Sequence, residues 1–173
     1  TNNIQASDDS SISGSSISIP PGSLTVSTEV TLLEGDTLST DHVSAALDLG
    51  SDIFESAGQA VVFLSDPETN AVEPMSIGIE MGNSAALAAS DDIVVIYKKI
   101  DADTGEFLLG VLPESDVTVS GNTVKLKTKH FGVYQVANSS TNITESTEIV
   151  TTVPVGIKSS PLRVGFKLLL NWG

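Results

Sequence analysis

Short stretches of alternating apolar and polar residues, each ended by turn-forming residues, recur along this chain and most constrain its fold. Side chains of a strand point alternately to its two faces, so a period of two predicts strands with one buried face. Residues 74–81 and 124–127 show this period most clearly. Gly, Pro, Asn and Asp separate the stretches at a spacing typical of antiparallel strands. The sequence therefore predicts an all-β fold, an antiparallel β-sandwich.

Two hairpins are expected in the second half of the chain. Residues 93–97 are followed by the turn sequence Asp-Ala-Asp-Thr-Gly and by a second apolar stretch at residues 106–109. Residues 117–119 and 124–127 flank the turn sequence Ser-Gly-Asn-Thr. A last strand is predicted to begin at Gly132.

Residues 38–49 form the one helix that the sequence predicts. Ser39 or Asp41 can cap it, because a short side chain with an oxygen accepts a backbone N–H at a helix start. An apolar stripe facing the sheets would consist of Val43, Ala46 and Leu47.

We expect one sandwich domain at residues 17–137, with segments of different composition around it. Residues 1–16 are rich in Ser, Asn, Asp and Gly, which predicts a flexible leader. Residues 138–152 are rich in Asn, Ser and Thr, which predicts a linker. Residues 153–173 form an apolar and basic C-terminal extension. This extension is a strand added to the sandwich, an assembly segment that packs on a neighbouring chain in a dimer or trimer, or the start of a further domain.

The charge of the chain is high and uneven. The net charge is −14, with 20 acids and two bases in residues 1–118 and two acids and six bases in residues 119–173. Such a field repels nucleic acid and anionic lipid from most of the surface, so we expect neither as a partner. The chain has no cysteine, which excludes disulfides and thiolate metal sites, and no apolar run long enough to predict a membrane span. The acidic charge indicates an exported protein kept in solution, or a cation-binding face.

Several motifs follow one another in an order that is typical of one family. Residues 19–24 are Ile-Pro-Pro-Gly-Ser-Leu and residues 28–32 are Thr-Glu-Val-Thr-Leu. A strand at 58–63 and an alternating strand after Pro74 follow, and residues 130–134 close the series with His-Phe-Gly-Val-Tyr. Together, over residues 12–137, they resemble the ZU5-like β-sandwich domain. Such domains occur in cytoskeletal linkers and death-signalling scaffolds, and similar repeats occur in bacterial surface proteins, the setting that this composition favours.

Some ZU5-like domains cleave themselves at a closing His-Phe-Ser motif, which the resemblance places at His130, Phe131 and Gly132. In that reaction the serine hydroxyl attacks the preceding carbonyl. Glycine offers no oxygen nucleophile, so we interpret the cleavage motif as degenerate and expect the 131–132 bond to stay intact. His130 is then expected to be structural, with a ring nitrogen bonded to a backbone carbonyl, and Gly132 to permit a bulge or a close backbone approach. No catalytic residue is predicted.

Asp101 and Asp103 are the candidate metal ligands of the chain. Two acids at i and i+2 followed by Gly105 resemble half of an EF-hand calcium loop, although the remaining ligands are absent. A hairpin turn explains the same residues, with Asp side chains bonded to the backbone and Gly at a positive φ. No cofactor is predicted other than this possible Ca²⁺.

A ligand is expected at an exposed sheet edge or at the loops at one end of the sandwich, with residues 65–73, 83–92 and 100–105 as candidates. Asp101 and Asp103 lie in the last of these, and an exposed Tyr97 or Trp172 would stack on a sugar ring, unless Tyr97 packs on a neighbouring strand. The sequence thus predicts a non-enzymatic extracellular module for adhesion or surface display that binds a cell-surface protein or glycan. The alternatives are a degenerate self-processing or scaffold domain and a Ca²⁺-stabilised bead of a larger surface protein.

Overall fold

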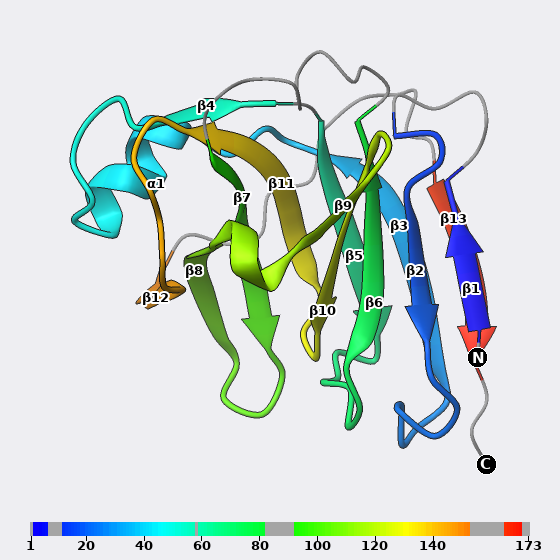
Figure 1. Ribbon diagram of the computed structural model, residues 1–173. Coiled ribbons are helices and arrows are strands. Elements are labelled where there is room, and N and C mark those ends of the chain that lie inside the picture. The colour runs from blue at the N-terminus through cyan, green and yellow to red at the C-terminus, as the bar shows by residue number, and fades with distance from the viewer. Residues whose placement is uncertain (1, 7–11, 58, 82–91, 153–164, 171–173) are drawn as a thin grey trace.

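The computed structural model describes residues 2–6, 12–57, 59–81, 92–152 and 165–170, the last as backbone only. The described strands form two antiparallel sheets packed face to face (Figure 1). The five-stranded sheet contains, in spatial order, β1 (Asn2–Gln5), β2 (Ser16–Ile19), β6 (Met75–Glu80), β10 (Thr123–Thr128) and β9 (Thr118–Ser120). The eight-stranded sheet contains β12 (Thr147–Thr151), β8 (Glu106–Leu112), β7 (Asp92–Asp101), β11 (Gly132–Ser139), β5 (Ala60–Asp66), β3 (Thr28–Gly35) and β13 (Gly165–Leu170), with β4 (Phe54–Ser56) paired to β11. The prediction of an all-β antiparallel sandwich is confirmed.

The main core lies between the two sheets and follows from the alternation in the sequence. Val124 and Leu126 of β10 are buried, whereas Lys125 and Lys127 are exposed on the outer face of the same strand. The predicted hairpins are present as β7–β8, which turns over residues 101–106, and β9–β10. Across the core, large side chains of the eight-stranded sheet meet these residues, among them Phe63 and Tyr134, whose rings pack edge to face.

A second core covers the far face of the eight-stranded sheet. The helix α1 (Thr40–Ala46) lies beside β4 (Figure 1), and its Val43 packs with Val62, Val94 and Val133 of the sheet. Ser39 caps the helix, as one of the two predicted alternatives, because its Oγ accepts a hydrogen bond from the backbone N–H of His42 at 3.3 Å. Among the described helices, none is long and apolar enough to span a bilayer.

A fully buried glutamine fastens this helical segment to the sheet. The side chain of Gln135 accepts a hydrogen bond from the backbone N–H of Leu38 at 2.7 Å and donates one to Ser56 Oγ at 2.7 Å. Both of its polar groups are therefore satisfied inside the second core, which removes the cost of burying them.

The two segments predicted to be a flexible leader and a linker both contain strands of the sheets. The leader predicted to be flexible contains β1, which pairs with β2, and its Ile4 and Ile12 are buried in the main core. The predicted linker contains β12, which pairs with β8 along Thr147–Thr151. Both segments are polar, but they become ordered because an open sheet edge offers them backbone partners.

The C-terminal extension also contributes a strand. Its residues 165–170 form β13, which pairs with β3 and lies beside β1 (Figure 1). The strand therefore extends the eight-stranded sheet, at the edge where the two sheets meet. Assembly of a dimer or trimer through this extension stays a prediction.

Candidate ligand-binding site

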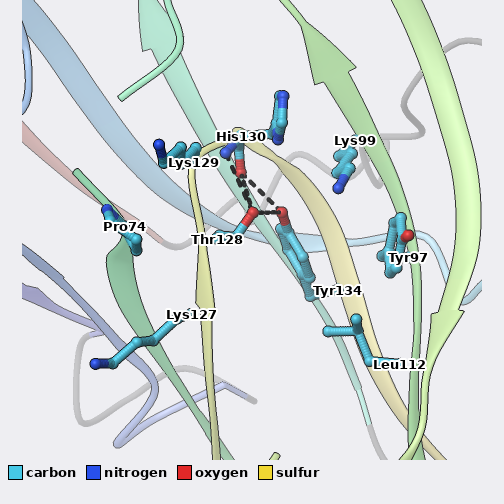
Figure 2. Close-up of a pocket in the computed structure, with 9 residues that line it drawn as sticks. All are labelled: Pro74, Tyr97, Lys99, Leu112, Lys127, Thr128, Lys129, His130 and Tyr134. Atoms are coloured by element: carbon cyan, nitrogen blue, oxygen red, sulfur yellow. Dashed lines mark hydrogen bonds between the residues drawn. The ribbon is translucent and has the colours of Figure 1, made fainter. Parts of the chain in front are cut away.

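The turn from β10 to β11 carries the closing motif, and side-chain hydroxyl groups hold its backbone in place. The Tyr134 hydroxyl donates to the carbonyl oxygen of His130 at 2.7 Å, and the His130 N–H donates to Thr128 Oγ1 at 3.1 Å (Figure 2). Thr128 Oγ1 also lies 2.8 Å from the Tyr134 hydroxyl, which closes a small network. Tyr134 itself is fully buried, so the turn is anchored in the main core.

The imidazole of His130 differs from its expected role. Among the described residues, the hydrogen bonds of His130 come from its backbone, not from a ring nitrogen bonded to a carbonyl. The ring is half-buried, and this burial, together with the positive charge of Lys99, lowers its pKa below the ordinary value. The ring is therefore kept neutral rather than recruited as a cation.

Gly132 occupies a position that no side chain fits. It lies opposite Lys99 in the β7–β11 pairing, and a Cβ atom there would be 2.5 Å from both the Lys98 carbonyl oxygen and Lys99 Cα. Both obstacles belong to the backbone and cannot rotate away. The predicted close backbone approach is thus present, and a serine at this position would require a different backbone.

Tyr97 is buried and reaches across a neighbouring strand. Its exposed fraction is 2%, and its hydroxyl donates to Glu148 Oε2 at 2.5 Å. Tyr97 and Glu148 are both paired with Gly110 of β8, where a Cβ atom would collide with the Tyr97 hydroxyl. Glycine at 110 therefore lets the phenol pass over β8 to β12. The prediction of an exposed Tyr97 that stacks on a sugar is wrong, and the alternative, packing against neighbouring strands, is correct.

A partly exposed ion pair completes this cluster. Lys99 Nζ lies 2.9 Å from Glu148 Oε2 and 4.7 Å from the centroid of the Tyr97 ring. Burial, reinforced by the bond to Glu148, raises the pKa of Tyr97 far above its ordinary value. Burial opposes the charged form of Glu148, yet the hydrogen bonds from Tyr97 and Lys99 outweigh it and lower the pKa of that carboxyl. The phenol is thus neutral and the carboxylate charged.

A hollow of about 290 Å³ lies over these side chains. Tyr97 and Tyr134 form its inner wall, with ring centroids 6.0 Å apart, and the amine of Lys99 points between them (Figure 2). Lys127 and Lys129 border the same hollow but extend away from the tyrosines (Figure 2).

A second, polar hollow of about 490 Å³ adjoins the first and shares Lys129 and His130 with it. Asn70 joins two of its walls, because its amide donates to Asp101 Oδ1 at 2.8 Å and accepts from the Ala102 N–H at 3.0 Å. The backbone N–H of Ala71 donates to the carbonyl of Lys129 at 2.8 Å, which joins the third wall. The structure therefore brings two predicted ligand loops, 65–73 and 100–105, to one end of the sandwich beside the closing motif. Of the third loop, residues 83–91 lie outside the described part of the chain, as does Trp172.

Asp101 and Asp103 adopt the geometry of a turn. Asp101 Oδ1 accepts from the Asp103 N–H at 3.0 Å as well as from Asn70, and Gly105 has a φ of +75°. The bond from Asn70 is the main reason that the pKa of Asp101 falls below its ordinary value. Within the described ranges, no group of three or more His, Asp or Glu side chains is placed to hold a metal ion. The carboxylate of Asp101 is thus used to fix the turn.

No family model, curated protein or solved structure matches this chain. The site therefore has to be judged by its own geometry. The sequence pattern did not indicate two of the main residues of the site. Glu148 lies in the predicted linker, and Asn70 is one polar residue among several in a loop. Their partners are 51 and 31 residues away along the chain, and no local pattern signals such contacts.

Proposed function

We propose that this chain is a non-enzymatic binding module, a ZU5-like β-sandwich that acts in adhesion or display at a bacterial cell surface. The order of its motifs and its two antiparallel sheets support this family. The observation that carries a binding role is the polar hollow at one end of the sandwich. Three loops, cross-linked by the bonds of Asn70 and Ala71, surround it. Loops held on a rigid sandwich are where such folds place their ligands.

The lining of the hollow favours a polar ligand. It combines the acids Glu68, Asp101 and Asp103 with the cations or donors Lys129 and His130. A ligand with both hydroxyl donors and acceptors, such as a cell-surface glycan or a polar protein loop, would find partners for both.

The same lining supports binding without chemistry. Covalent catalysis needs a nucleophile within hydrogen-bond reach of a base. In the described part of the chain, no hydroxyl is hydrogen-bonded to the imidazole of His130, and Gly132 replaces the serine of the cleavage motif. We therefore assign no catalytic residue.

A panel of immobilised glycans and extracellular matrix proteins, probed with the labelled chain, tests this proposal. We expect the chain to be retained by at least one of them, and Asp103→Ala to weaken that retention about tenfold, since one charged hydrogen-bond partner would be lost. Glu55→Ala, which removes an exposed acid on β4 instead, serves as the matched control and should bind like the original chain. Equal binding by Asp103→Ala, retention by none of them, or chemical conversion of the retained ligand would overturn the proposal.

A further inference from the structure

The outer face of the five-stranded sheet has an unusual composition. Across this face, Asn3, Ser18, Ser76 and Lys127 form one row of paired residues, and Ser16, Gly78, Lys125 and Thr118 belong to the next row. On β1, β2, β6 and β10, the side chains of the opposite face are Ile, Met, Val and Leu residues of the main core. We call the outward side chains of β1, β2, β6, β10 and β9 the hydroxyl face, because most carry a hydroxyl or an amide.

The hydroxyl face is also positively charged within an acidic protein. Its one described carboxylate belongs to Glu80, which accepts a hydrogen bond from Thr123 at 2.7 Å. Lys125 and Lys127 are exposed and form no ion pair with any described residue. Both belong to residues 119–173, the part of this acidic chain in which bases outnumber acids.

A groove gives this face a binding geometry. It has a volume of about 560 Å³ and lies between β10 and the short 3-10 helix η2 (Glu114–Asp116). Lys125, Lys127, Ser76, Ser115 and Thr118 line it together with one acid, Asp116, and with the apolar side chains of Leu112, Val117 and Leu126. Side chains two apart on a strand are roughly 7 Å apart along it, so the two amines can meet successive charges of an extended ligand.

We propose that the hydroxyl face binds a linear acidic polysaccharide, one that carries carboxylate or sulfate groups. Its hydroxyls and amides offer hydrogen bonds to sugar hydroxyls, and its lysines offer charge-assisted bonds to the acid groups. The described outward side chains of the face include no aromatic ring, as nucleic-acid stacking would use. Lys127 also borders the first hollow, but the groove shares no lining residue with the polar hollow, and the inference does not depend on the proposed function.

Binding of the full chain to polygalacturonate, dextran sulfate and neutral dextran tests the inference. We expect the chain to bind at least one of the two acidic polymers, more tightly at low salt, and not to bind dextran. The double variant Lys125→Gln/Lys127→Gln should bind about tenfold more weakly or less. Lys125→Arg/Lys127→Arg, which keeps both charges, should retain binding.

A matched control separates this face from overall charge. Ser51→Glu/Val150→Glu changes two exposed positions away from the hydroxyl face and lowers the net charge by two units, as the double Gln variant does. It should bind like the original chain. The inference is overturned if neither acidic polymer binds, if this control loses as much affinity as the double Gln variant, or if poly-glutamate or single-stranded DNA binds equally well. A dimer that light scattering detects and that the double Gln variant loses would instead assign the face to a second copy.

Discussion

The two sheets of this protein differ in how many of their faces are covered. The eight-stranded sheet has the main core on one face and the second core, with α1, on the other. Its strand β11 is buried at every residue, and β7 carries the continuous apolar run Ile93–Tyr97. The five-stranded sheet is buried on one face only, and its strand β10 alternates strictly between Val124 or Leu126 and exposed lysines.

Because of this difference, substitutions in the two sheets should have different effects. Substitutions in the central strands of the eight-stranded sheet disturb packed atoms on both sides, so they should cost stability. Substitutions on the hydroxyl face disturb little packing, so any functional effect there reports on a ligand.

Gly132→Ser, which restores the cleavage motif, should destabilise the fold by about 3 kcal/mol. The cause is the new Cβ atom, which would lie 2.5 Å from the backbone of Lys98 and Lys99. Chemical denaturation measures the loss, and a denaturing gel checks that the chain stays whole. Gly132→Ala should cost nearly as much, because the clash begins at Cβ. A stable serine variant that splits at the 131–132 bond would contradict this account.

Gln135→Leu should cost about 2 kcal/mol of unfolding free energy, although the side chains have similar sizes. The variant leaves the buried N–H of Leu38 without its acceptor and removes the hydrogen bond from Gln135 Nε2 to Ser56 Oγ. Denaturant unfolding measures the change, with Gln59→Leu, at an exposed position before β5, as control. Equal stabilities for both variants would mean that Gln135 does not fasten the helical segment.

Stability should fall as the pH is lowered, in two stages. The pKa of His130 is lowered from 6.5, so the unfolded chain binds more protons just below that pH and the native state loses stability there. Glu148 and Asp101 have pKa values lowered from 4.5 and 3.8, and their contributions, complete above those values, are lost at lower pH.

Melting temperatures between pH 8 and pH 3 follow both stages. His130→Gln should remove the stage below pH 6.5 and leave the lower one, since glutamine does not titrate. A chain that becomes more stable between pH 7 and pH 5 would contradict the burial of a neutral imidazole.

The double variant Lys125→Gln/Lys127→Gln should change the free energy of unfolding by less than about 0.5 kcal/mol. Both side chains are exposed and have no ion-pair partner among the described residues. Thermal unfolding of this variant therefore sharpens the contrast between the sheets, because binding changes while stability does not. A loss comparable to that of Gln135→Leu would show that the hydroxyl face supports the fold.

The sequence predicts the parts of this fold that depend on local patterns. The β7–β8 and β9–β10 hairpins, the cap at Ser39 and the alternation of β10 all follow from neighbouring residues. The strands β1 and β12 do not, because their polar residues become a strand only when a distant edge pairs with them.

In the candidate site, too, some residues could be predicted from local patterns and others could not. Asp101, Asp103 and the 65–73 loop carry turn signals that sequence reasoning detects. The burial of Tyr97 depends instead on Gly110 and Glu148, two residues on other strands whose meeting is set by sheet register.

Native-state hydrogen exchange tests the division between the two sheets most directly. Amides of β5, β7 and β11, covered on both faces, should exchange only through global unfolding, whereas those of β1, β2 and β9 should exchange through smaller openings. Exchange free energies should therefore drop on passing from the eight-stranded to the five-stranded sheet. Equal protection in both sheets, or the highest protection in β1, β2 and β9, would contradict it.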